Sequence, residues 1–123
     1  MKRTSVVALT LMALLSLALT VWAKDGTEKL TGVLVDKSCS AKVAKSETPQ
    51  TAAEGHPKGC AVKCKDGGYG VFVDGKFYEF DAKGNELALK VLEGSSADKG
   101  VKVNVEGTKH ENHLMVSKLE EVK

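Results

Sequence analysis

The chain has 123 residues, with 18 Lys and Arg against 16 Asp and Glu, and a formal net charge of +2. Lys2 and Arg3 lie at the very start, and the rest of the sequence is neutral and contains no arginine. Because binding to a nucleic-acid backbone depends on clustered Lys and Arg, we expect no nucleic-acid partner.

The N-terminal segment has the features of a cleavable secretion signal. A basic start is followed by the mainly apolar residues 6–21, and small residues precede a cut after Ala23. The apolar run is shorter than the roughly 20 residues that a membrane-spanning helix needs. We therefore expect residues 1–23 to be removed and residues 24–123 to form a single domain. That domain would be periplasmic or secreted, without a stable membrane anchor.

The first part of the predicted domain contains a strand, a loop and a short helix. Residues 28–36 are rich in β-branched side chains and partly alternate, which is typical of a strand. Residues 40–59 are small or polar and include both prolines, which predicts a long loop. Pro57 suits the first turn of a helix through residues 60–65, which Gly67-Gly68 would end.

The second part begins with a predicted hairpin. Two strand-like runs, 69–73 and 76–80, flank Asp74-Gly75, a pair that strongly indicates a two-residue hairpin turn. Residues 85–93 have an amphipathic pattern that predicts a helix, with Leu87 and Val91 on one face and Gly94 just past its end. Two further strands are predicted, at residues 101–106 and 114–119.

The order of these elements predicts a mainly β fold. Five strands, with one helix between the third and fourth, match an OB-like barrel whose cysteine-bearing loop and short helix lie between the first two strands. A flat α+β sheet is the alternative. Gly32, Gly70 and Gly107 lie within or beside strands, where strongly curved sheets use glycine, and favour the barrel.

The three cysteines predict a metal site. In a helix, Cys60 and Cys64 would share one face, with Cβ atoms about 5–6 Å apart, which suits one metal ion better than a disulfide. His56 lies four residues earlier, and Cys39 follows the first strand. Three cysteines and one histidine can bind a tetrahedral zinc ion, and thiolates also suit copper(I).

A disulfide is the alternative for the same residues. Exported proteins reside where thiols oxidise, and Cys39 could pair with either Cys60 or Cys64 and fasten the long loop to the first strand. Either pairing would leave one thiol, which suggests intermolecular pairing, reactivity or a ligand role. The corresponding function is a binding or structural module that is stabilised by a disulfide and contains no metal.

Other candidate residues carry less weight. His110, His113 and Met115 near the last turn could take copper, but solvated turn residues are the better interpretation. Asp36 and Asp81 each end a strand, where turn formation explains them better than acid/base chemistry. The sequence contains no Ser/His/Asp signature, phosphate loop or nucleotide fingerprint, so we expect no enzyme. The partner would be an envelope protein or a small ligand.

Four patterns occur in order along the chain. They are G-x3-D-x2-C at 32–39, C-x3-C at 60–64, an Asp-Gly hairpin within 73–81, and V-x-V-x-G within 100–108. Together they make the chain similar to a widespread group of small exported bacterial proteins of unassigned function. The resemblance implies an OB-like barrel in the cell envelope, and it carries no established activity or ligand. Ser40 is a departure, because a glycine often follows the first cysteine in that group.

Overall fold

The structure, a computed structural model, describes residues 27–123. The predicted signal, residues 1–23, lies outside the described residues, so the cut after Ala23 stays a prediction. Among residues 27–123, no helix is both long enough and apolar enough to cross a membrane.

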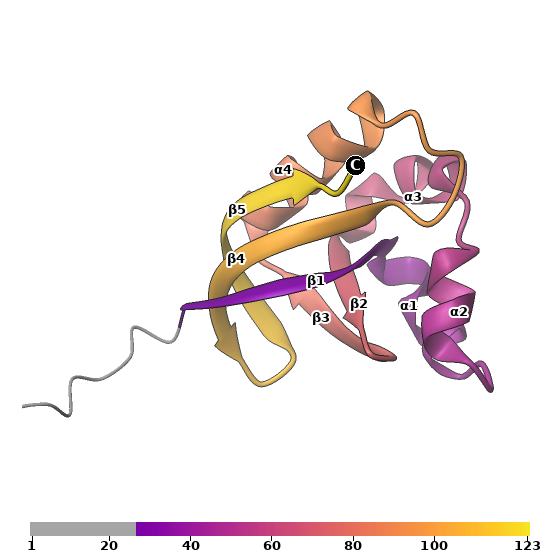
Figure 1. The fold of residues 1–123 in the computed structure, drawn as a ribbon, viewed down its shortest axis with the longest axis horizontal. Helices are drawn as coiled ribbons and strands as arrows, with labels where there is room; N and C mark the ends of the chain where they lie inside the picture. Colours follow the sequence, from indigo (N-terminus) through magenta and orange to yellow (C-terminus); the bar gives the residue numbers. More distant parts are fainter. Residues whose placement is uncertain (1–26) are drawn as a thin grey trace, which may run out of the picture.

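Five strands form one mixed sheet. They are β1 (Thr27–Asp36), β2 (Tyr69–Val73), β3 (Lys76–Phe80), β4 (Lys102–His110) and β5 (His113–Glu121). The hydrogen-bonded order is β1-β2-β3-β5-β4, and β4 pairs back with β1, so the bonding closes into a ring (Figure 1). All neighbours are antiparallel except β3 and β5, which are parallel. The predicted number of strands is confirmed.

The predicted hairpin joins β2 and β3. Val73 pairs with Lys76, and the two residues between them have positive φ values of 50° at Asp74 and 79° at Gly75. Positive φ at both central residues matches the right-handed twist of the flanking strands. The Asp-Gly pair thus fixes the turn and the register of this hairpin.

Helix α4 (Ala82–Gly94) lies between β3 and β4 in the chain. It begins three residues earlier than predicted, because the Asp81 side chain accepts a hydrogen bond from the Gly84 backbone N–H and caps the helix. Ala88 and Leu92, four residues apart, are buried against the sheet. Leu87 and Val91, on which the prediction centred the face, are half-buried, so the buried face is centred one residue later and the helix starts earlier than predicted.

The predicted long loop at residues 40–59 is wrong. Two helices occupy most of it, α1 (Lys37–Ala44) and α2 (Pro49–Glu54). Asp36 caps α1, and Pro49 stands in the first turn of α2. The alanines of both segments and the lysines of α1 are good helix formers. The predicted short helix is present as α3 (Lys58–Lys63), followed by the 3₁₀ turn η1 (Lys65–Gly67).

The second half of β1 is buried on both faces. Leu34 belongs to a larger core that includes residues of all five strands, α3 and α4. The smaller core lies beneath α1 and α2 and consists of Val33, Val35, Val43, Ala53 and Phe72. Covering both faces explains why this strand carries a continuous apolar run. It also brings the next residue, Asp36, into a fully buried position.

Candidate metal centre

Asp36 is the centre of the candidate site. It ends β1, and one of its carboxylate oxygens, Oδ2, accepts a hydrogen bond of 2.9 Å from the backbone N–H of Cys39. This bond caps α1, while the residue itself is 0% exposed. Because a buried carboxylate is costly unless it has partners, its second oxygen needs one as well.

His56 supplies that partner. Its Nε2 lies 2.7 Å from Asp36 Oδ1, and the imidazole side chain is only 8% exposed. The backbone of His56 is held on both sides, since its N–H donates to the Ala53 carbonyl and its carbonyl accepts from the Gly100 N–H. The residue just beyond α2 is thereby fixed beside the end of β1.

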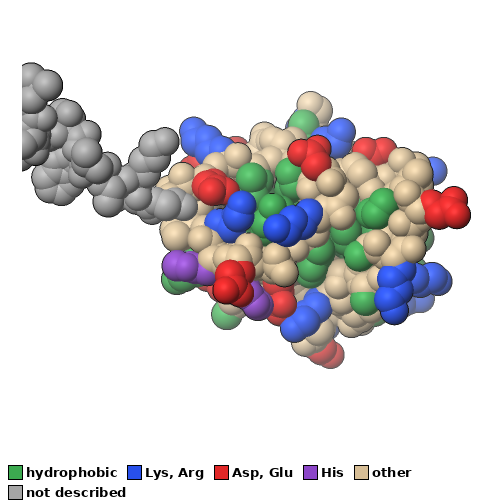
Figure 2. All heavy atoms as spheres, turned by 90° about the horizontal axis from the view of Figure 1, so that it is seen from below, with side chains coloured by type: hydrophobic (Ala, Val, Ile, Leu, Met, Phe, Trp, Pro, Cys, Tyr) green, Lys and Arg blue, Asp and Glu red, His purple; other side chains and the backbone are tan. Residues whose placement is uncertain are grey.

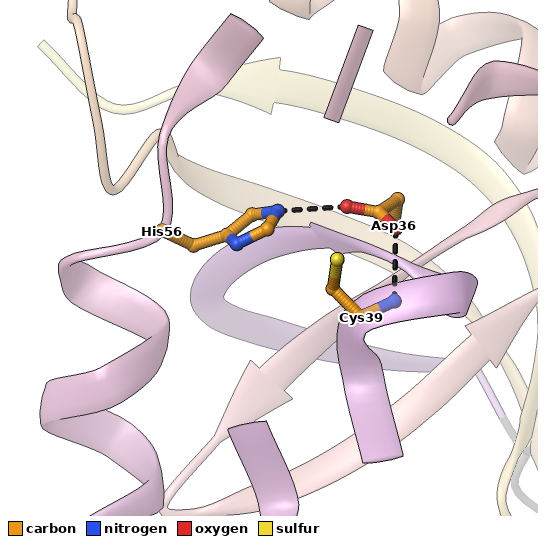
Figure 3. A group of neighbouring side chains, drawn as sticks. All are labelled: Asp36, Cys39 and His56. Carbon is orange, nitrogen blue, oxygen red and sulfur yellow. Dashed lines mark hydrogen bonds and ion pairs between the residues drawn. The ribbon is translucent and has the colours of Figure 1, made fainter. Parts of the chain in front are cut away.

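Cys39 completes a compact group. It lies in the first turn of α1, and its side chain is directed toward Asp36 and His56 (Figure 3). One carboxylate oxygen, one imidazole nitrogen and the Cys39 Sγ all lie within 4.8 Å of one another. Oxygen, nitrogen and sulfur donors of these kinds are the ligands that zinc takes from proteins.

The other two cysteines have different surroundings. Cys60 lies in α3 and is exposed, whereas Cys64 follows the end of that helix and is half-buried. Asp36 and Cys39 both affect the pKa of the Cys64 thiol, which therefore lies at the edge of the group. The backbone N–H of Cys64 donates to the Cys60 carbonyl, so the predicted helical spacing is retained. All three cysteines are free.

Helix α3 is anchored by a buried phenol. The Tyr69 hydroxyl donates a 2.9 Å hydrogen bond to the Ala61 carbonyl. Burial, with the nearby charge of Asp36, raises the pKa of Tyr69 to about 12, so the hydroxyl remains a donor well above neutral pH. This bond holds the helix that carries Cys60, and the thiol of Cys64 just beyond it, against β2.

The buried carboxylate suppresses ionisation of the neighbouring thiols. Burial, then the negative charge of Asp36, then a hydrogen bond to Asp36 raise the pKa of Cys39 to about 11. Burial and the same carboxylate also raise the pKa of Cys64. A nucleophilic cysteine requires the opposite shift, so the Cys39, His56 and Asp36 trio does not supply an activated nucleophile.

These surroundings predict the order of thiol labelling in the reduced, metal-free protein. At pH 8, we expect iodoacetamide to modify exposed Cys60 first and Cys39 about 100-fold more slowly than a free cysteine, because so little thiolate is present. The rate at Cys39 should rise steeply as the pH approaches 11. Asp36→Asn, which removes the repelling charge, should accelerate it at pH 8. Peptide mass spectrometry measures each rate, and free-cysteine reactivity at Cys39 would contradict this account.

The structure thus joins two of the predicted ligands, Cys39 and His56, and adds Asp36 to them. Our expectation that Asp36 mainly forms a turn was incomplete, because the carboxylate caps α1 and also contacts His56. The signal in the sequence was the spacing Asp36-x2-Cys39, because the side chain that caps the start of a helix bonds to the backbone of the residue three positions later. Only the fold shows that His56 reaches the same carboxylate.

The other candidate residues lie elsewhere. Asp81 caps α4 and also accepts from the Val116 N–H. His110 and His113 are paired in register across the turn between β4 and β5, and His113 Nδ1 is 3.8 Å from Glu79 Oε2. Within residues 27–123, neither histidine belongs to a group of three potential ligands.

Comparisons with known proteins do not add to this geometry. The chain matches no model of a protein family, and no curated protein or solved structure is significantly similar to it. The functional argument therefore rests on the chain's own residues.

Proposed function

We propose that this chain is an exported, non-enzymatic protein with an OB-like barrel that binds one soft transition-metal ion. The observation that carries the proposal is the proximity of the Asp36, Cys39 and His56 ligand atoms, all within 4.8 Å in a largely buried corner. Cys64, whose pKa is affected by Asp36 and Cys39, is the residue that we propose as a fourth ligand. The ring-like strand bonding, with α4 between β3 and β4, supports the barrel over a flat sheet.

The donor set favours zinc over copper(I). Copper(I) prefers soft sulfur and imidazole ligands, whereas zinc also accepts a carboxylate oxygen. The Asp36 to His56 contact of 2.7 Å is shorter than the separation that a tetrahedral ion imposes on two ligands. Two ligand atoms at about 2.0–2.1 Å from a tetrahedral zinc ion lie roughly 3.3 Å apart. For both residues to bind, the Asp36 oxygen and the His56 nitrogen must therefore move apart by about half an ångström. That change is within the reach of side-chain rotation.

Native mass spectrometry of the reduced protein tests this proposal. With micromolar zinc we expect one ion per chain, and Cys39→Ser or His56→Asn should weaken binding about 100-fold because each removes a ligand. His113→Asn is the matched control, since that imidazole is exposed and outside the group. No bound ion in the wild-type protein, or equal losses for both histidine variants, would refute the proposal.

A second candidate function is supported by the proximity of Cys39 and Cys64, each of which affects the pKa of the other. In an oxidising compartment these thiols could form a disulfide, which would make the chain a stapled binding module without a metal. Intact mass of the protein recovered without reductant distinguishes the two. A loss of two hydrogen masses, removed by reductant, indicates the disulfide, and three alkylatable thiols after metal removal indicate the metal site.

The surface supports a partner other than nucleic acid. On the face shown in Figure 2, lysines and acidic side chains are interspersed. A phosphate backbone is instead bound by a surface with clustered positive charge. A metal donor or acceptor protein in the cell envelope is the partner that we propose.

A further inference from the structure

A hollow of about 430 Å³ opens beside the candidate metal centre, between α1, α2 and α3. Cys39 and His56 line it, whereas Asp36 is fully buried. The exposed thiol of Cys60 also lines this hollow, although it lies outside the close group of ligand atoms. One space therefore joins solvent, an exposed thiol and two of the proposed ligands.

We propose that this hollow is the route by which the ion is exchanged, and that Cys60 is the transfer ligand which binds the ion before Cys39 and His56 do. The inference rests on the proposed metal site and assigns a different task to each cysteine. Cys39 holds the ion at equilibrium, and Cys60 determines how fast it arrives and leaves. Such a division suits a protein that passes metal on rather than one that stores it.

The walls of the hollow indicate how the ion is delivered. Val43, Ala52 and Pro57 give it an apolar surface, which offers a hydrated ion no replacement for its water. Lys42 also lines it and repels a free cation. Both features favour a donor in which the ion is already bound to a small anionic thiolate, and whose negative charge Lys42 attracts.

The transfer step is a ligand exchange without oxidation or reduction. The sulfur of Cys60 forms a bond to zinc while one donor sulfur gives up its bond to the ion. The proton that Cys60 loses passes to the departing donor thiolate. The ion then moves deeper as the neutral imidazole of His56 displaces a remaining donor sulfur, which leaves as a thiolate. Cys39 next replaces Cys60, and the proton that Cys39 loses passes to the released Cys60 sulfur.

Stopped-flow transfer of zinc from its glutathione complex to the reduced protein tests the route. Cys60→Ser should slow uptake and chelator-driven release at least about tenfold, with the equilibrium constant changed less than about threefold. Ala52→Leu, which narrows the hollow and keeps every thiol, should also slow both rates. Lys63→Ser, an exposed change on the same helix, is the control and should leave both rates unaltered.

Three results would overturn the route. Unchanged rates in both Cys60→Ser and Ala52→Leu would show that the ion enters elsewhere. A loss of affinity of about 100-fold in Cys60→Ser would make Cys60 a resident ligand instead. A wild-type chain that binds no zinc would refute the proposed function itself, which distinguishes that failure from the first two.

Discussion

Replacing Asp36 with alanine is expected to lower the free energy of unfolding by about 3 kcal/mol and to abolish zinc binding. The carboxylate caps α1 and accepts from His56, and it is 0% exposed. Loss of a cap costs about 1 kcal/mol, and leaving the buried imidazole without a partner costs roughly 1–3 kcal/mol more. Urea denaturation followed by circular dichroism measures the first effect, and zinc titration measures the second.

Asp81→Ala is the matched control for this variant. Asp81 also caps a helix and accepts from two backbone N–H groups, but it lies outside the candidate site. We expect this variant to lose about 1–2 kcal/mol and to bind zinc normally. Asp36→Asn keeps the shape of the side chain and one oxygen, with an amide nitrogen in place of the other oxygen, and it should fold better than the alanine variant. Normal zinc affinity in Asp36→Ala would contradict the assignment of this carboxylate to the site.

Replacing Gly32 with alanine is expected to destabilise the fold by about 3 kcal/mol, near the upper end of overpacking costs. A Cβ at this position would lie 2.2 Å from the Phe72 carbonyl oxygen and 2.8 Å from a methyl carbon of Val71. Because the new Cβ would meet mainly backbone atoms of Phe72, which cannot rotate away, β1 and β2 would have to separate where Val33 pairs with Phe72. The midpoint of urea unfolding should fall accordingly.

Gly94→Ala provides the control for that prediction. It is the same substitution at the end of α4, where a new Cβ would meet nothing within 4 Å. Alanine reduces the entropy of the unfolded chain, so a gain of about 0.5 kcal/mol is expected. Equal stability of the two variants would show that β1 and β2 do not approach each other as closely as described.

Local chemistry in the sequence predicted the hairpin and the strands well. Asp74-Gly75 provides two residues that tolerate positive φ, and the alternating run beginning at Val101 has its buried side chains on one face of β4. Gly32, which the sequence placed within a strand, lies where β1 and β2 approach so closely that no side chain fits. For the hairpin and the alternating strand, the determining residues lie close together in the sequence.

The segment between β1 and β2 was harder to predict. Its composition resembled a loop, but α1 and α2 are stabilised by burying Val43 and Ala53 against β1 and Phe72, which are distant in sequence. The contact between His56 and Asp36 spans 20 residues and depends on that packing. Sequence spacing likewise joined Cys60 and Cys64 on one helix face, and could not show that the Asp36 carboxylate raises the pKa of Cys64.

The site has two features that bear on the oxidation of its thiols. Cys39 and Cys64 remain protonated next to Asp36, which slows oxidation of the metal-free form because the thiolate is the reactive species. A bound cation would offset the charge of Asp36 and favour ionised sulfur. The same carboxylate would thus protect the empty site and stabilise the loaded one.

X-ray absorption at the zinc edge of the loaded protein tests the central claim most directly. We expect a mixed shell, with sulfur at about 2.3 Å and nitrogen or oxygen at about 2.0–2.1 Å, including the outer scattering of one imidazole. The sulfur contribution should decrease in Cys39→Ser, and the imidazole contribution should disappear in His56→Asn. A shell of nitrogen and oxygen alone, or one that neither substitution changes, would contradict a metal centre at Asp36, Cys39 and His56.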